Sequence, residues 1–197
     1  MKYVQQVFDR LSRGGFISSD SVDESTRNIF LDIEDHQDDY SEYFEQIGFI
    51  LEEGTGFFYF SRRESKTALV DKLKRFGHWI DILDFLKAWE PALGPGFTFI
   101  HADLMIKIDS DIELREKAKS LYENKVKNDE ICDRLMEELS RQGFIEQLDD
   151  VAQRYQVTAA YRYLVTIQRT RRCSRRLEKG EDCVVGRVAV LLGCLDD

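Results

Sequence analysis

Residues 40–61, YSEYFEQIGFILEEGTGFFYFS, combine a helix pattern and a hairpin pattern. Their first half carries apolar residues at i, i+3, i+4 and i+7, which predicts the inward stripe of an amphipathic helix: Tyr40, Tyr43, Phe44 and Ile47. Gly48 ends this helix, because glycine adopts a positive φ without a Cβ clash. Two extended segments at 49–51 and 57–60 flank a glycine-containing turn at 52–56, the pattern of a β-hairpin. A helix that leads directly into a hairpin is typical of the second half of a winged-helix domain.

The residues before this stretch supply the first half of such a domain. A first amphipathic helix is indicated by Val4, Val7, Phe8 and Leu11, and a short extended segment by residues 16–17. Ser21 and Glu24 have the spacing of a capping box, which predicts Ser21 as the N-cap of a second helix. That helix directs Ile29, Phe30 and Ile33 inward. Helix, short strand, helix, helix and hairpin make a complete winged helix in about 60 residues.

A long helix is predicted from residue 64 to residue 90. It is apolar nearly all round between Trp79 and Trp89, and such a helix is buried between other elements. We therefore expect both tryptophans to be buried and the helix to pack against two domains. Pro91 and the Gly-Pro-Gly at 94–96 end it.

The order of elements then repeats. Residues 97–100 form a short strand, 101–108 fit a helix or a strand, and Asp109-Ser110-Asp111 caps a helix with four apolar residues: Ile112, Leu114, Ala118 and Leu121. A helix from Asn128 carries Ile131, Leu135 and Leu139 at i, i+4 and i+8, and Gly143 ends it. A second hairpin follows at 144–148 and 154–158. A last helix at 159–172 directs Ala160, Leu164 and Ile167 inward.

The fold class predicted from these elements is mainly α with small β-hairpin wings, an α+β protein with tandem winged-helix domains. We divide the chain into an N-terminal winged helix at 1–63, a connecting helix and linker at 64–96, and a C-terminal winged helix at 97–172. Residues 173–197 show no clear period, and their role stays open.

Charge is distributed unevenly along the 197 residues. The formal net charge is −9, and residues 1–60 hold 4 basic residues against 13 acidic ones, so the whole excess lies in the first third. This balance argues against a protein that coats nucleic acid, because phosphate binding needs positive potential. We expect a cytoplasmic protein with reduced thiols, because the start lacks the apolar core of a signal peptide and no apolar run is long enough to span a membrane.

No catalytic, cofactor or metal site is predicted. The residues show no nucleophile–base set and no phosphate-binding glycine loop. The carboxylates around His36, at 34–39, are interpreted as a solvated acidic loop, because metal ligands must converge in space. His78 and His101 lie among apolar residues and are interpreted as structural, and Cys132 as part of the core.

Two groups of residues are candidates for binding. A basic group runs from the first wing into the long helix and is a candidate for weak phosphate contact: Arg62, Arg63, Lys66, Lys72, Lys74 and Arg75. A second arginine cluster lies at 169–176. Aromatic residues on both faces of the returning strand predict an exposed partner-binding surface: Phe57, Phe58, Tyr59 and Phe60.

These residues resemble a known family. Residues 43–51, YFEQIGFIL, and 54–62, GTGFFYFSR, are similar to the first wing of the MksE subunits, the MukE-like members of bacterial SMC condensins. LSRGGFIS at 11–18 is similar to their opening helix and turn. YQVT at 155–158, with YRYL at 161–164, resembles the end of their second winged helix. The resemblance covers residues 1 to about 168.

The resemblance implies a tandem winged-helix subunit that binds a kleisin (MksF) and, through it, the SMC ATPase MksB. Such subunits form homodimers, have no activity of their own, and act on the nucleoid in chromosome organisation or plasmid defence. The alternative is a free-standing winged-helix transcription regulator, which needs a basic recognition helix. The predicted helix at 40–47 is instead acidic, so we expect the first winged helix to bind protein and any DNA contact to be weak and sequence-indifferent.

Overall fold

The computed structural model describes residues 1–62, 66–122 and 127–168, except for the side chains of residues 66–75. The first unit, residues 1–62, consists of three helices and three strands: α1 (Val4–Leu11), β1 (Ile17–Ser18), α2 (Glu24–Asp35), α3 (Gln37–Glu45), β2 (Ile50–Gly54) and β3 (Phe57–Ser61). Its sheet has the order β1-β3-β2, all antiparallel. This arrangement is consistent with a winged helix.

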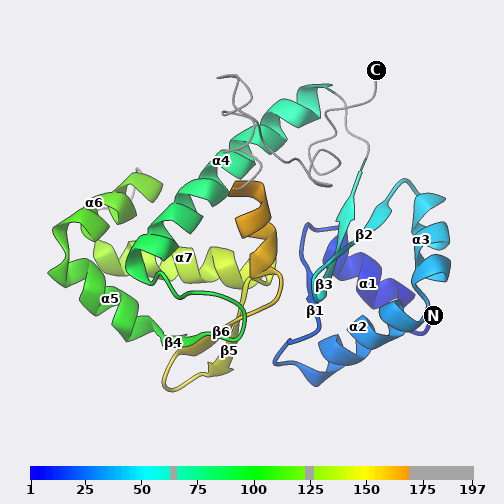
Figure 1. Ribbon diagram of the computed structural model, residues 1–197, viewed down its shortest axis with the longest axis horizontal. Helices are drawn as coiled ribbons and strands as arrows, with labels where there is room; N and C mark the ends of the chain where they lie inside the picture. The colour runs from blue at the N-terminus through cyan, green and yellow to red at the C-terminus, as the bar shows by residue number, and fades with distance from the viewer. Residues whose placement is uncertain (63–65, 123–126, 169–197) are drawn as a thin grey trace.

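The second unit, residues 66–168, repeats the plan with additional helices: α4 (Lys66–Trp89), β4 (Thr98–Ile100), α5 (His101–Ser110), α6 (Ile112–Leu121), α7 (Asn128–Gln142), β5 (Ile145–Asp149) and β6 (Arg154–Val157). Residues 161–168 are helical. The sheet order β4-β6-β5 matches that of the first unit. The chain is therefore α+β and mostly helical, with two small antiparallel sheets, as predicted (Figure 1).

The same glycine motif joins helix to hairpin in both units. Gly48 and Gly143 have φ of +81° and +84°. The N–H of the residue after each glycine donates to the carbonyl five residues earlier, Phe49 to Phe44 at 3.0 Å and Phe144 to Leu139 at 2.9 Å. This is the Schellman arrangement, which satisfies helix carbonyls that have no intrahelical partner. Both predicted helix ends are confirmed.

Each unit has its own hydrophobic cluster. In the first unit the predicted inward residues Ile29, Phe30 and Ile33 are buried, and so are Val7 and Leu11 of α1. In the second unit Ile131, Leu135 and Leu139 are buried in a larger cluster. That cluster also contains Phe16 and Phe57 from the first unit, so the two units share buried apolar surface.

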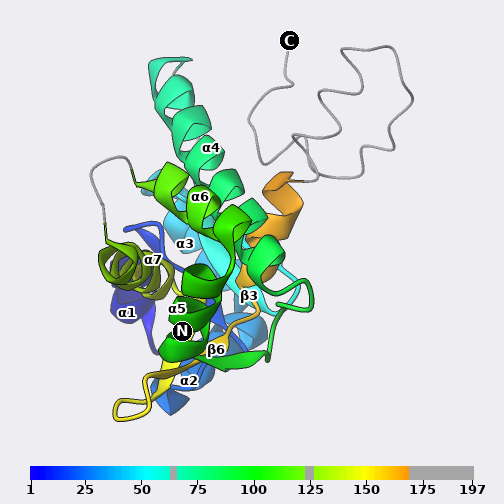
Figure 2. The same cartoon turned by 90° about the vertical axis from the view of Figure 1, so that its left-hand side faces the viewer.

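The long helix α4 packs into the second unit. Trp89 is buried against Phe99, with ring centroids 5.1 Å apart. Trp79 is only partly buried, with its ring 5.1 Å from Phe144. Asp81 and Asp84 are exposed, so the prediction of a helix that is apolar nearly all round is wrong. The first turns of α4 extend beyond both units (Figures 1 and 2).

Three further expectations need correction. The N-cap of α2 is Asp23, whose carboxylate accepts from the N–H groups of Ser25 and Thr26, and not Ser21. The expected loop at 34–39 is instead the end of α2 and the start of α3, joined at His36. Two residues of the predicted inward stripe, Tyr43 and Ile47, are exposed.

The remaining predicted elements are borne out where the structure describes them. Residues 101–108, whose sequence fitted a helix or a strand, lie in helix α5. Ala160, Leu164 and Ile167 are buried. The predicted domain boundaries at 63/64 and 96/97 stay a prediction, and residues 169–197 lie outside the described part of the chain.

Candidate partner-binding groove

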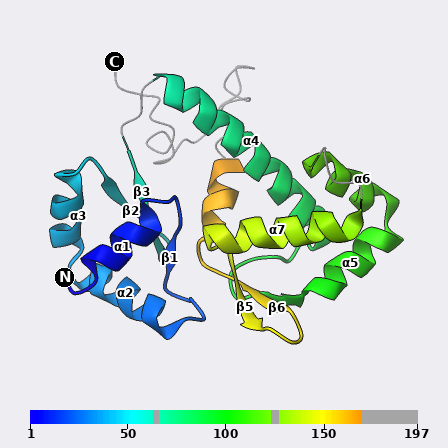
Figure 3. The ribbon, with the colours of Figure 1, turned by 180° about the vertical axis from the view of Figure 1, so that it is seen from behind.

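The junction between the two units is built on aromatic rings. Phe16, next to β1, is at its centre, and its ring centroid lies 5.0–5.9 Å from four others: Phe57, Tyr59, Phe144 and Tyr163. Phe16 is 8% exposed. Offset and edge-on ring pairs at these distances stabilise more than their buried area alone. The rings therefore join the two units, which lie side by side (Figure 3).

Polar contacts reinforce the junction beside the rings. The Glu146 carboxylate on β5 accepts from the Ser21 hydroxyl at 2.8 Å and from the Val22 N–H at 2.5 Å. Asp20 accepts from the Ala159 N–H at 2.8 Å. Because hydrogen bonds to charged groups are stronger than neutral ones, these contacts hold the loop before α2 against the second sheet.

The tip of the first wing also contacts the second unit. Gly56 has φ of +82°, and a Cβ there would lie 2.9 Å from the Ser19 hydroxyl oxygen and 3.3 Å from the Ala159 Cβ. The Arg162 guanidinium donates to the Thr55 carbonyl at 3.0 Å. Glycine is required at position 56 for both its backbone angle and this close approach.

A groove follows the junction. On the α4 side is a hollow of about 370 Å³, whose floor is made of rings that include Phe16, Tyr59 and Trp79. Its described lining contains two guanidiniums, those of Arg13 and Arg62, and no carboxylate. Two further hollows, of about 490 and 660 Å³, lie on the α1 and α7 side. Their lining is mixed in charge: it adds Arg10 and Arg141, and also Asp9, Asp23 and Glu146. All three share Gly15 and Gln142, so they adjoin.

Such a groove suits an extended peptide segment. Apolar rings provide contact area, and arginine guanidiniums bind carboxylates with fixed geometry. The Arg62 guanidinium lies 3.8 Å above the Phe49 ring centroid, which orients it at the groove edge. A segment that carries both apolar side chains and carboxylates matches this lining best.

The predicted aromatic surface is only partly available. Phe57 and Phe58 are 4% and 0% exposed, so the expectation that the second face of the wing is open is wrong for them. Phe58 packs in the first unit, and Phe57 packs in the second cluster. The partly buried Tyr59 and Phe60 line the groove, where partner binding stays a prediction.

Of the predicted basic group, the structure describes the side chain of Arg62 alone. Arg62 is exposed at the end of β3 and lines the groove. Arg63 lies outside the described residues, and so do the side chains of Lys66, Lys72, Lys74 and Arg75. Their phosphate contact stays a prediction. Arg13 and Phe16 are groove residues that the sequence analysis did not identify. The ring partners of Phe16 are more than 40 positions away in the chain, and no local sequence pattern indicates such contacts.

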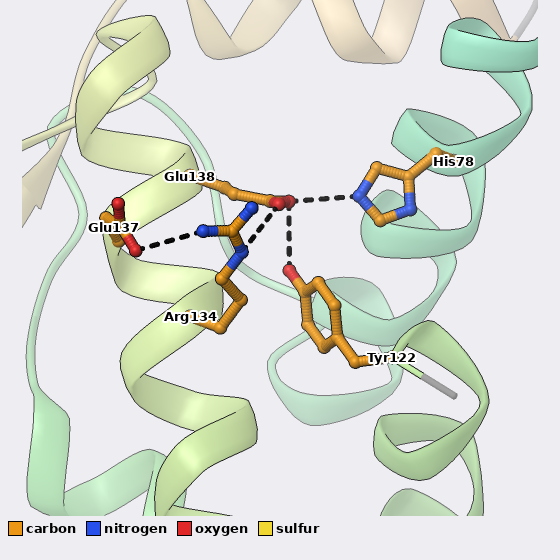
Figure 4. A network of polar contacts seen from close by, with 5 residues as sticks. All are labelled: His78, Tyr122, Arg134, Glu137 and Glu138. Carbon is orange, nitrogen blue, oxygen red and sulfur yellow. Dashed lines mark hydrogen bonds and ion pairs between the residues drawn. The ribbon is translucent and has the colours of Figure 1, made fainter. Parts of the chain in front are cut away.

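A buried polar network ties α4 to α7 in the second unit. The Glu138 carboxylate accepts from the His78 ring at 2.9 Å, the Tyr122 hydroxyl at 3.0 Å and the Arg134 guanidinium at 3.1 Å (Figure 4). Burial alone would raise the pKa of Glu138. The hydrogen bonds from His78 and Tyr122 and the charges of His78 and Arg134 outweigh it, and its pKa lies below the ordinary value. His78 is structural in this network.

Because the pKa of Glu138 is lower in the folded chain than in the unfolded chain, its carboxylate adds stability above the unfolded value. That contribution is lost as pH falls through the folded pKa. We expect Glu138→Gln to lower the free energy of unfolding at pH 7 by about 1–3 kcal/mol and to weaken its acid dependence. Urea titrations at pH 7 and pH 4 measure both.

Glu137→Gln is the matched control, since Glu137 also contacts Arg134 but is 60% exposed. It should cost less than about 1 kcal/mol, as exposed ion pairs do. Equal losses for the two variants would mean that the buried network has no special contribution.

The described residues show no metal site, no reactive cysteine and no membrane-spanning helix. The described residues contain no group of three His, Cys, Asp or Glu side chains that could hold a metal ion. Cys132 is buried, and burial raises its pKa to about 12, which keeps the thiol protonated. Among the helices that the structure describes, none has the length and apolarity to cross a membrane.

Two comparisons with known proteins bear on identity. A search of curated proteins found no match. A family scan matched residues 2–168 to the family described as "Condensin complex protein MksE".

Proposed function

Because the chain belongs to the family of condensin complex protein MksE, we propose that it is the kleisin-binding subunit of an MksBEF-like SMC complex. MksE is a family of non-catalytic condensin subunits. In this complex the subunit binds an MksF-like kleisin and, through it, an MksB-like ATPase. Its role is in chromosome organisation or plasmid defence on the nucleoid, in the cytoplasm, and it acts as a homodimer.

The observation that supports this function is the junction groove. In its hollow on the α4 side, rings form the floor, Arg13 and Arg62 line it, and the described lining has no carboxylate. An extended kleisin segment with apolar and acidic side chains would satisfy both parts of the lining. On the other side of the junction Arg10 and Arg141 lie among the carboxylates of Asp9, Asp23 and Glu146, so the acidic part of the segment is expected on the α4 side.

The geometry disfavours the alternative of a transcription regulator. In a winged helix that reads DNA, α3 would enter the major groove and present arginine, lysine, asparagine or glutamine. Here α3 has four exposed carboxylates and no basic residue. These carboxylates would repel the phosphate backbone. DNA contact, if made through Arg62 and its neighbours, would be weak, sequence-indifferent and steeply salt-dependent.

Capture of the full chain from its native host, followed by mass spectrometry, tests the proposed function. We expect the kleisin and the SMC ATPase to be enriched together in the eluate, and their enrichment to persist after nuclease treatment, because protein contacts hold them. The control is capture with Phe16→Ala, which disturbs the groove floor. Recovery of neither subunit with the native chain would contradict the proposal.

A further inference from the structure

The first unit exposes an apolar surface away from the junction. Tyr43 in the last turn of α3 is 45% exposed, Ile47 in the turn that follows α3 is 51% exposed, and Ile50 at the start of β2 is 36% exposed. α3 and β2 are in contact, and β2 is the edge strand of its sheet. We call Tyr43, Ile47 and Ile50, with the exposed side of α3, the α3–β2 face. Grouped exposed apolar residues mark an interaction surface.

The exposed side of α3, beside these apolar residues, is strongly negative. Four exposed carboxylates lie on α3: Asp38, Asp39, Glu42 and Glu45. Among the described residues no cation pairs with any of them. The last turn of α3 has no basic residue, so Glu45 adds to the negative end of the helix dipole. A cation near the end of α3 would be stabilised by the carboxylates and by the helix dipole.

These charges select the occupant. A second copy of the same face would bring like charges together, which costs free energy at an interface. A nucleic acid would be repelled for the same reason. The complementary occupant is a polypeptide with clustered positive charge and apolar side chains.

The chain itself contains such a segment. Residues 169–176, RTRRCSRR, hold five arginines and no acidic residue, and residues 184–192, VVGRVAVLL, are apolar with one further arginine. Both lie outside the described part of the chain. The described chain ends at Gln168, which is buried and bonds to Asp84 and Lys87 of α4.

We propose that the α3–β2 face is the docking site of this chain's own residues 169–192. The arginines pair with the α3 carboxylates, and the apolar residues cover Tyr43, Ile47 and Ile50. The 24 residues after Gln168 span up to about 80 Å when extended, enough to reach any surface of a folded chain of this size. Tethering holds the segment at roughly millimolar effective concentration, so weak contacts suffice.

This inference concerns a surface distinct from the junction groove, and it does not depend on the proposed function.

Native cysteines make the proposal testable in the full chain. Cys173 lies among the arginines and Cys183 precedes the apolar run, whereas Cys132 is buried. Gln46→Cys adds one thiol at the exposed α3–β2 face, and a short bismaleimide then links nearby thiols. The control is Glu113→Cys, at an exposed site on α6. α6 packs against α4, and Gln168, the last described residue, also contacts α4.

We expect the link from position 46 to Cys173 or Cys183 to form about ten-fold faster than the link from position 113, within single chains, as a docked tether predicts. Peptide mapping identifies the linked pair. The advantage should disappear at about 1 M salt, where screening shortens to about 3 Å, and in Asp38→Asn/Glu42→Gln/Glu45→Gln. Equal linking rates at the two positions, or a rate advantage insensitive to both changes, would overturn the proposal.

Discussion

Phe16→Ala is expected to lower the free energy of unfolding by about 3–5 kcal/mol, the usual cost of removing a buried phenylalanine ring. Four neighbouring rings would lose their common contact, and they come from both units. The loss should therefore also uncouple the units. Both tryptophans lie on α4, so tryptophan fluorescence follows the second unit, whereas far-UV circular dichroism follows the helices of both.

In the wild type the two signals should change together during urea denaturation, as one cooperative transition requires. In Phe16→Ala we expect them to separate. Phe30→Ala is the matched control, because Phe30 is equally buried but packs within the first unit. A loss below about 1 kcal/mol for Phe16→Ala, far under the cost of a buried ring, with coincident signals, would show that the junction is not a shared core.

Much of the fold could be predicted because its signals are local. Gly48 and Gly143 end helices through a backbone angle that glycine adopts most easily. Ile131, Leu135 and Leu139 mark an inward stripe through spacing alone. Each signal is contained within a few residues, and the structure agrees with it.

The failures have long-range causes. Ser21 and Asp23 are both good N-caps, and the Ser21 hydroxyl instead donates to Glu146, 125 positions away. Tyr43 and Ile47 fit the helical period, yet the core has room only for Tyr40 and Phe44. Spacing shows which residues share a face but not how wide a stripe the neighbouring elements cover.

The candidate groove was only half visible in the sequence. Arg62, Tyr59 and Phe60 are part of the predicted basic and aromatic groups, and all three line it. Arg13 and Phe16 lie in the segment between α1 and β1, outside both predicted groups. Phe57 is buried because it packs against the second unit. The second unit closes over one side of the wing, which turns an expected open surface into a groove.

The groove's arginines should dominate kleisin binding. Arg13 and Arg62 are exposed at its edges, and the described chain places no carboxylate within ion-pair distance of either. Reversing both charges replaces attraction for an acidic segment with repulsion. At about 1 kcal/mol or more per charge in a partly exposed site, Arg13→Glu/Arg62→Glu should weaken binding about 10- to 100-fold, or about 1.4–2.7 kcal/mol.

The matched control changes the same net charge elsewhere. Lys107→Glu/Lys117→Glu reverses two exposed charges on α5 and α6, away from the junction (Figure 1). Any effect of overall charge on encounter would appear in both double variants. An effect of the groove would appear only in Arg13→Glu/Arg62→Glu.

The dissociation constant of the full chain for the purified host kleisin, measured by isothermal titration with wild type and both double variants, tests the central claim most directly. We expect Arg13→Glu/Arg62→Glu to weaken binding about 10- to 100-fold, whereas Lys107→Glu/Lys117→Glu should leave it within about two-fold of the wild type. Equal affinity for all three proteins, or no binding of the kleisin by the wild type, would contradict the central claim.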